Sequence, residues 1–195
     1  MEIHGHFQYN GIHTTQQVPN IKSYFESLLK EENFDVIIEI GTSFGGLTQI
    51  IDDIIKENNL KHNIHTFDFS HKDYVENQLK ERNCFYYIMD EREDDFKNAV
   101  KNLIGTTEKV LLLCDGGNKI DEFNTYSKLL KVGDVIMAHD YAYNEQVFLD
   151  EMKDKYWNWF EINYDDIKSS VESCGLTEYN KTNFKYAAWA CYQKN

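Results

Sequence analysis

Apolar and polar positions follow two different periods along the chain. Residues 36–40 form a short apolar run that contains one acid, and a glycine-rich turn follows it. Apolar residues then return at Leu47, Ile50, Ile51, Ile54 and Ile55, the spacing of one helix face. This order predicts a buried strand, a tight turn and an amphipathic helix.

The same alternation continues through the middle of the chain. Apolar runs predict four further strands, over residues 64–68, 84–89, 110–114 and 135–138. Helical spacing predicts one helix before residue 36 and others between the strands, on residues 96–104 and 120–130. Strands that alternate with helices indicate an α/β fold with a mostly parallel sheet and helices on both faces.

The two ends of the chain follow this pattern less clearly. Residues 1–15 are polar and aromatic without a period, which predicts an N-terminal arm. Residues 146–156 have helical spacing, while residues 157–164 and 184–192 have the composition of two strands. We expect these two strands to pair antiparallel at one edge of the sheet. The 195 residues fit one domain, residues 1–195.

Composition narrows the classes of partner. The formal net charge of −13 repels phosphate backbones, so nucleic acid is disfavoured, as is an anionic membrane surface. The sequence has no apolar stretch of bilayer length and no signal-peptide pattern. Its four cysteines include no C-x-x-C pair, which favours reduced thiols and a cytoplasmic location.

The turn after the first strand is the strongest candidate for a binding site. Gly41 and Gly45 suit a turn where the backbone approaches a ligand closely, and the following helix offers free N–H groups. An ordinary strand-to-helix turn is the alternative. The acid before the first glycine and a second glycine four residues later favour a nucleoside-type ligand.

Acids lie at the ends of five strands, at Glu39, Asp68, Asp90, Asp115 and Asp140. In an open α/β sheet the carboxyl ends of the strands form the ligand crevice, so these carboxylates are expected along one rim. A single acid at such a position is most often a helix cap or a solvated turn. Five on one rim would repel one another unless a ligand or cation uses them.

These motifs together resemble a known superfamily. Glu39-x-Gly41-x-x-x-Gly45 is similar to the first motif of class I S-adenosylmethionine-dependent methyltransferases, and residues 112–119 and 129–140 extend the similarity. The chain most resembles the cephalosporin-hydroxylase-like and macrolide sugar O-methyltransferases, and more distantly the catechol type. The resemblance implies a Rossmann-like, seven-stranded, mostly parallel sheet flanked by helices, with the last strand antiparallel.

The resemblance also implies where S-adenosylmethionine binds. The cofactor would lie over the glycine turn, with its ribose on Asp68 and its adenine near Asp90 and Glu91. The full set of cofactor-binding residues implied is Glu39, Gly41, Thr42, Ser43, Gly45, Asp68, Asp90, Glu91 and Asp115.

A metal site is the next implication. Metal-dependent relatives hold a divalent cation on the aspartate after the fourth strand and on an acid pair after the fifth, which map to Asp115, His139 and Asp140. One member of that pair is often Glu, whereas this chain has His139. Imidazole binds metals but suits Mg²⁺ less well than oxygen does, so Mg²⁺, another divalent cation and no metal all stay open.

The catalytic base is also open. Relatives commonly carry His or Lys at the position of Asn118, which cannot accept a proton, and Lys119 comes next. The catalytic candidates are therefore Lys119, His139 and the replaced position Asn118, with His71, Tyr141 and Tyr143 as further bases. Lys119 capping a helix and His139 bonding within the fold are the structural alternatives.

The function expected is an S-adenosylmethionine-dependent O-methyltransferase that acts on a small hydroxylated molecule, a sugar or a phenol, with help from a divalent metal if one binds. The alternative is a non-catalytic S-adenosylmethionine-binding regulatory or assembly protein, which Asn118 and His139 favour. An NAD-dependent enzyme is disfavoured because the G-x-G-x-x-G spacing is missing. The sequence leaves the oligomeric state open, a homo-oligomer included.

Overall fold

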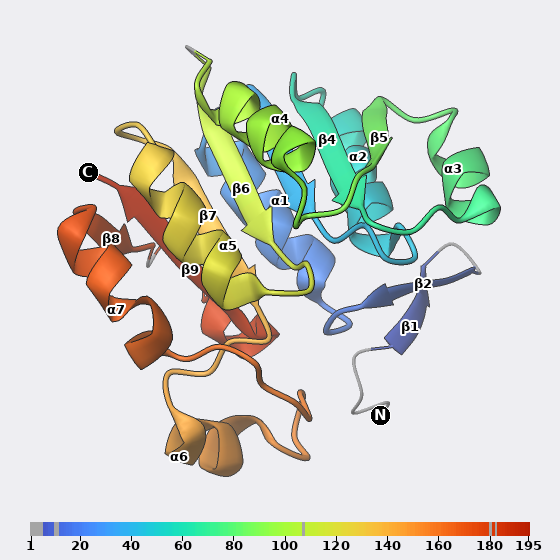
Figure 1. The fold of residues 1–195 in the computed structure, drawn as a ribbon. Helices are drawn as coiled ribbons and strands as arrows, with labels where there is room; N and C mark the ends of the chain where they lie inside the picture. Colours follow the sequence, from blue (N-terminus) through green and yellow to red (C-terminus); the bar gives the residue numbers. More distant parts are fainter. Residues whose placement is uncertain (1–5, 10–11, 107, 180, 182) are drawn as a thin grey trace.

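The computed structural model describes residues 6–9, 12–106, 108–179, 181 and 183–195. Its centre is a seven-stranded sheet with the order β5-β4-β3-β6-β7-β9-β8 (Figure 1). The strands are β3 (Val36–Ile40), β4 (Asn63–Asp68), β5 (Cys84–Ile88), β6 (Val110–Cys114), β7 (Val135–His139), β8 (Leu176–Glu178) and β9 (Trp189–Lys194).

The strand directions confirm the predicted Rossmann-like sheet. Strands β3 to β7 are parallel, and β9 is antiparallel to both β7 and β8. The strand order changes direction at β3, which has β4 on one side and β6 on the other. Ligands bind outside the carboxyl ends of the strands at such a switch point.

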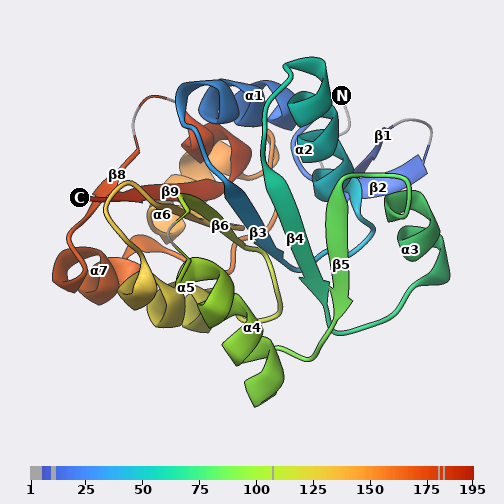
Figure 2. The same cartoon turned by 90° about the horizontal axis from the view of Figure 1, so that it is seen from above.

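Helices cover both faces of the sheet, as Figure 2 shows: α1, α2 and α3 lie on one side and α4, α5 and α7 on the other. Their bounds are α1 (Ile21–Glu31), α2 (Gly46–Glu57), α3 (Asp73–Leu79), α4 (Asp94–Ile104), α5 (Lys119–Tyr126), α6 (Glu145–Val147) and α7 (Tyr164–Ser173). A π-helical turn (Phe148–Met152) continues α6, and 3-10 turns occupy Ser127–Leu129 and Phe184–Ala187.

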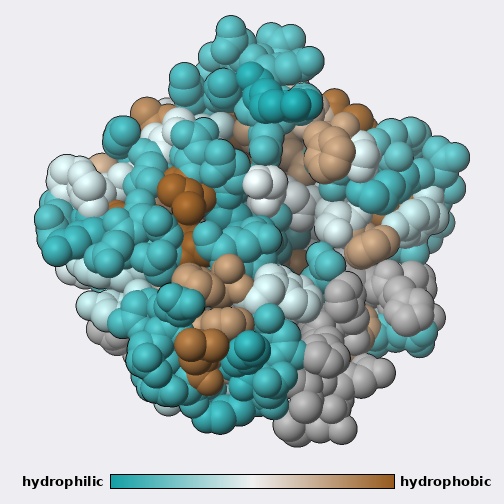
Figure 3. Space-filling view, turned by 60° about the horizontal axis from the view of Figure 1, so that its bottom comes forward, coloured by the Kyte–Doolittle hydropathy of each residue, from teal (hydrophilic) through white to brown (hydrophobic). Residues whose placement is uncertain are grey.

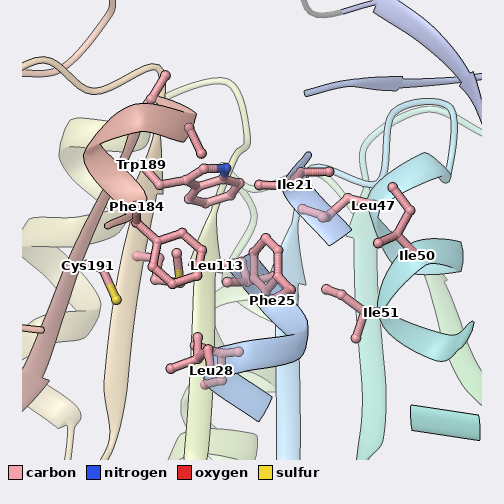
Figure 4. Packing of buried hydrophobic residues seen from close by; sticks show 14 of the residues in the cluster. Ile21, Phe25, Leu28, Leu47, Ile50, Ile51, Leu113, Phe184, Trp189 and Cys191 are labelled. Carbon is pink, nitrogen blue, oxygen red and sulfur yellow. The ribbon is translucent and has the colours of Figure 1, made fainter. Parts of the chain in front are cut away.

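Two apolar cores follow from the alternation of side chains along the central strands. Leu111 and Leu113 of β6 point into the core under α1 and α2, together with Phe25 and Ile51 (Figure 4). Leu112, between them, is buried in the opposite core with the residues of α4, α5 and α7. Both faces of β3 and β6 are therefore covered, which explains why these two strands are apolar at every position but Glu39.

The C-terminal expectation was wrong in one part. Residues 157–164 do not form a sheet strand; apart from a bridge between Tyr141 and Ile162 they are irregular up to α7. The strand that pairs antiparallel with β9 is β8, which the sequence did not indicate. Trp157 is fully buried because it packs in the core under α1 and α2 and donates from its Nε1 to Asp140 Oδ1, without pairing in the sheet.

The N-terminal expectation also needs correction. Residues 1–5 and 10–11 of the predicted arm lie outside the described residues, but β1 (His6–Tyr9) and β2 (Ile12–Gln16) form an antiparallel hairpin. The Tyr9 hydroxyl donates to Asp53 Oδ2 of α2 at 2.8 Å, which ties the hairpin to the body of the molecule. In the part of the chain that the structure describes, none of the helices has the length and apolar character needed to span a bilayer.

Candidate functional site

The turn between β3 and α2 needs glycine for a steric reason. Gly41 has φ +95°, and a Cβ at this position would lie 2.1 Å from the carbonyl oxygen of Asp115. The ends of β3 and β6 therefore approach each other more closely than any side chain permits. Gly45, with φ +76°, turns the chain into α2.

Glu39 lies just before this turn and faces the fold rather than open space. Its Oε2 is 2.5 Å from the hydroxyls of both Thr48 and Thr66, and the residue is 1% exposed. Burial raises the pKa of Glu39 to about 8, against the opposing effect of the two hydroxyls. The carboxyl group thus joins α2, β3 and β4.

Asp68 ends β4 beside the same turn. Its Oδ2 accepts a hydrogen bond from the backbone N–H of Ser43 at 2.7 Å, and its Oδ1 accepts from that of Ser70 at 2.8 Å. The Lys72 ammonium lies 3.3 Å from Oδ1. These contacts hold the carboxylate at the wall of a cavity.

That cavity, of about 490 Å³, runs along the carboxyl ends of the parallel strands. The size is within the range of roughly 300–1,000 Å³ typical of small-molecule sites. Figure 3 brings this side of the molecule forward; hydrophilic surface predominates there, and the hydrophobic patches are small and separate. Of the implied cofactor-binding residues, those that line the cavity are Gly41, Ser43, Asp68, Glu91 and Asp115.

The other implied cofactor residues lie outside this lining. Glu39 faces the two threonines, Thr42 shares a 2.6 Å hydrogen bond with Thr66, and Gly45 begins α2. Asp90 pairs with Arg92, whose hydrogen bonds lower the pKa of this carboxyl to about 2. These four residues shape the turn and strand ends, and Asp90 faces Arg92 rather than the cavity.

The end of the cavity formed by the turn and Asp68 is called the cofactor end. It fits an adenosyl compound, because a backbone without side chains meets a carboxylate that can accept two ribose hydroxyls. The apolar side chains of Met89 and Phe96 line the same cavity beside Gly116 and Gly117. Flat adenine rings suit such an apolar slot.

The other end, called the acceptor end, is built around a lysine. Lys119 Nζ lies 2.7 Å from Glu161 Oε2, 3.2 Å from Asp140 Oδ2 and 3.8 Å from Asp115 Oδ1. Burial alone would lower the pKa of Lys119, but the carboxylates of Asp115, Asp140 and Glu161 outweigh it and raise the pKa above its usual value. Lys119 is therefore an ammonium at neutral pH and cannot accept a proton.

Asp115 and His139 form a close pair behind the lysine. His139 Nδ1 is 3.0 Å from Asp115 Oδ1, and the imidazole is packed against Trp157 and Trp189, with ring centroids 4.9 and 4.6 Å away. Burial raises the pKa of Asp115, and the positive charges of His139 and Lys119 oppose this. Burial lowers the pKa of His139, but the carboxylates of Asp115 and Asp140 raise it overall.

Asp115, His139 and Asp140 each offer a ligand atom within 4.8 Å of the others, so they form a group that could hold a metal ion. The Lys119 ammonium already contacts both carboxylates of this group. In addition, Asp140 Oδ1 accepts a hydrogen bond from Trp157 Nε1 at 2.8 Å. Mg²⁺ needs near-octahedral oxygen ligands, and with Lys119 in place this donor set does not fit it.

Sequence reasoning missed three contributors to the acceptor end. Glu161 and Trp159 line the cavity from the irregular segment that was expected to be a strand. Gln17 Nε2 lies 3.5 Å from both Asp115 Oδ2 and His139 Nδ1, and Trp189 Nε1 donates to its Oε1 at 2.8 Å. Gln17 lies in a short polar run that carries no chemical signal of its own.

Asn118 does not line the cavity. Its side chain accepts a hydrogen bond from the backbone N–H of Asp121 at 3.2 Å and thereby caps α5. The cap fixes the first turn of the helix, which begins at Lys119. Asn118 thus has a clear structural role, and the lysine that follows it is the one that enters the site.

Comparisons with known proteins agree with this fold. Two CmcI structures, one an apo form and one with magnesium and S-adenosylmethionine, both have a TM-score of 0.66 to this chain. The apo form is 10% identical over 96% of this chain, and the other is 11% identical over 97%. Each comparison covers 76% of the CmcI chain. A provisionally assigned caffeoyl-CoA O-methyltransferase from Staphylococcus aureus has a TM-score of 0.61 at 17% identity, covering 91% of this chain and 86% of its own.

MycE, a methyltransferase of mycinamycin biosynthesis with magnesium, S-adenosylhomocysteine and mycinamycin VI bound, has a TM-score of 0.54 at 14% identity; 91% of this chain covers 49% of that one. At such identities these structures show a shared fold. No curated protein sequence matches the chain significantly.

A family profile goes further than the structures. The profile described as Rhamnosyl O-methyltransferase/CmcI matches residues 2–172, well over half of the chain. The match includes the glycine turn, Asp68 and every residue of the acceptor end except Trp189. The chain therefore belongs to the rhamnosyl O-methyltransferase/CmcI family and is an S-adenosylmethionine-dependent methyltransferase.

Proposed function

We propose that residues 1–195 form one methyltransferase domain that methylates a hydroxyl group of a small acceptor without negative charge, a sugar or a phenol. The observation that carries this proposal is the composition of the acceptor end. Asp115, Asp140 and Glu161 face the Lys119 ammonium and the His139 imidazole, so the carboxylates of the acceptor end outnumber its positively charged groups. A phosphorylated or nucleotide-bearing acceptor would be repelled there.

The same end suits a ring with hydroxyl groups. Trp159 lines the cavity and offers an aromatic surface, while the surrounding carboxylates can accept hydrogen bonds from hydroxyls. Sugars and phenols combine a flat apolar face with such donors. The overall charge of −13 and the free thiols of all four cysteines support a cytoplasmic enzyme that does not act on nucleic acid.

S-adenosylmethionine supplies an activated methyl group on a positively charged sulfur. The protein holds this cofactor through the Gly41 turn and the Asp68 carboxylate. Asp115, at the cavity wall of the acceptor end, can accept the proton of the acceptor hydroxyl, and His139 Nδ1 at 3.0 Å orients its carboxylate. Positioning and such a base account for much of the rate in reactions of this type.

The test replaces the base without changing its shape. Asp115→Asn is expected to lower kcat by about 10²–10⁴-fold, the usual contribution of a general base, while S-adenosylhomocysteine still binds. Methyl transfer from radiolabelled S-adenosylmethionine to a panel of sugars and phenols measures the first effect, and calorimetry measures the second.

Asp73→Asn is the control, because the Asp73 side chain is 89% exposed on α3 and does not line the cavity. It should leave both readouts unchanged. Full activity of Asp115→Asn would contradict the assigned base, and preferential methylation of a phosphorylated acceptor would contradict the assigned substrate class.

A further inference from the structure

Lys119 Nζ contacts both carboxylates of the group that could hold a divalent cation. We propose that the ammonium of Lys119 is the built-in cation of the acceptor end, so that methyl transfer by this chain needs no metal ion. The inference rests on the proposed function, since it concerns how the same site handles a hydroxyl acceptor. Three independent features of the structure support it.

The first feature is the set of carboxylates that the Lys119 ammonium contacts. The Lys119 ammonium contacts the two carboxylates, Asp115 and Asp140, that belong to the group able to hold a metal. A third carboxylate, Glu161, comes from a separate segment and makes the shortest contact, at 2.7 Å. A divalent ion on the same oxygens would lie within a few ångström of the ammonium, and the two positive charges would repel each other.

The second feature is how firmly the lysine is held. Its side chain is only 8% exposed, and Nζ also donates to the carbonyl oxygen of Gly116 at 3.2 Å. Lys119 is the first residue of α5, whose start is fixed by the Asn118 cap. An ordinary surface lysine keeps its ammonium in water, whereas this one is anchored at both ends of its side chain.

The third feature is charge. The resemblance places an acid where this chain has His139, so one carboxylate of the expected metal site is missing. His139 Nδ1 faces Asp115 at 3.0 Å and adds no negative charge. The group able to hold a metal therefore contains two carboxylates instead of the three that the resemblance implies, and this weakens its binding of a cation of charge two.

The ammonium can take over the functions of a metal at this place. It lines the cavity, and its positive charge can stabilise the negative charge that develops on the acceptor oxygen as the proton leaves. Unlike Mg²⁺ it imposes no octahedral geometry. The carboxylates of Asp140 and Glu161 then serve to place the lysine.

The test compares the protein with Lys119→Ala, and uses Mn²⁺ as a probe whose binding is seen by electron paramagnetic resonance. The unmodified protein should bind no Mn²⁺ at this site and should keep its activity within about twofold after dialysis against EDTA. Lys119→Ala should lose at least 100-fold in activity in EDTA, bind Mn²⁺, and regain at least tenfold with Mg²⁺. Lys128→Ala, an exposed lysine on the following turn, is the control and should behave as the unmodified protein.

The outcomes separate this inference from the proposed function. Loss of activity of the unmodified protein in EDTA, with recovery on Mg²⁺, would overturn the inference and leave the function intact. If no acceptor is methylated, the proposed function fails, but Mn²⁺ binding still decides: equal binding by both proteins overturns the inference. Should Lys119→Ala not bind S-adenosylhomocysteine, Lys119→Met, which keeps the length of the side chain, replaces it in the same comparison.

Discussion

The two ends of the cavity are built in different ways. At the cofactor end, residues 41–43 are consecutive, and Asp68 follows at the end of the neighbouring strand. Much of that surface is main chain, and the steric need of Gly41 decides its shape. At the acceptor end, the polar side chains come from five separate segments: Gln17, Asp115, Lys119, the pair His139 and Asp140, and Glu161.

This contrast determines how each end should respond to mutation. A binding surface made of main chain depends on the backbone dihedral angles of its residues. We therefore expect one substitution that disturbs these angles to affect both folding and cofactor binding. In a cluster of charged side chains from distant segments, we expect the loss of a peripheral side chain to have a small effect and the loss of the central side chain to have a large one. The predictions below test these two expectations, beginning with the largest effect.

Gly41→Ala should be the most damaging change at the cofactor end. An L-residue at φ +95° costs roughly 1–2 kcal/mol. The added Cβ would also meet the Asp115 carbonyl oxygen at 2.1 Å, and relieving such overpacking costs about 1–3 kcal/mol more. Denaturant unfolding should show the sum, and calorimetry should show at least tenfold weaker binding of S-adenosylhomocysteine.

Gly133→Ala is the matched control for this prediction. Gly133 has φ +93°, but a Cβ there meets only Lys109 Cε, at 3.6 Å. Gly133→Ala should therefore lose stability only through the unfavourable φ angle, and it should bind S-adenosylhomocysteine as the unmodified protein does. Equal losses of affinity for S-adenosylhomocysteine in the two variants would show that the close approach of β3 and β6 does not matter for binding.

The same contrast explains what could be predicted from the sequence. Strands β3 to β7 and the cofactor turn were predicted because their signals are local: apolar runs, helical spacing and two glycines. The acceptor end was predicted only in part. Asp115, His139 and Asp140 directly follow or end strands, whereas Glu161 lies in a segment whose aromatic residues imitate a strand.

Contacts between distant residues explain the remaining errors. Glu161 meets Lys119 across 42 positions, and Trp157 is buried because its indole reaches Asp140, not because it belongs to a sheet. Nothing in the local pattern indicates such partners. The role of Lys119 as a fixed ammonium likewise depends on three carboxylates that come together only in the fold.

Glu39→Gln tests the buried contact beneath the glycine turn through the pH dependence of stability. The pKa of Glu39 is about 8 in the folded protein, against 4.5 as the ordinary value, so the folded state holds a proton that the unfolded state has lost between these pH values. Stability should therefore fall as the pH rises through this window, by up to about 1.4 kcal/mol per unit of pH.

Glutamine cannot ionise, and its carbonyl oxygen can accept the hydrogen bonds of both Thr48 and Thr66. The free energy of unfolding of Glu39→Gln should therefore exceed that of the unmodified protein by about 4 kcal/mol at pH 8, and the gap should shrink toward pH 5. Urea unfolding at several pH values measures this. Glu57→Gln, an exposed position of α2, should leave the profile unchanged, and a parallel profile for Glu39→Gln would contradict the raised pKa.

Glu161→Gln should have the smallest effect of all, although it removes the shortest contact of Lys119. The Glu161 side chain is 55% exposed, so water screens its charge and the loss of stability should stay below about 1 kcal/mol. Lys119 keeps Asp115 and Asp140, and we expect a few-fold rise in KM for the acceptor with unchanged binding of S-adenosylhomocysteine. Steady-state kinetics and calorimetry on the same preparation measure both. A fall in kcat as large as that of Asp115→Asn would mean that Glu161 belongs to the centre of the charge cluster. The contact distances and burial of the charged side chains would then not predict the size of their effects.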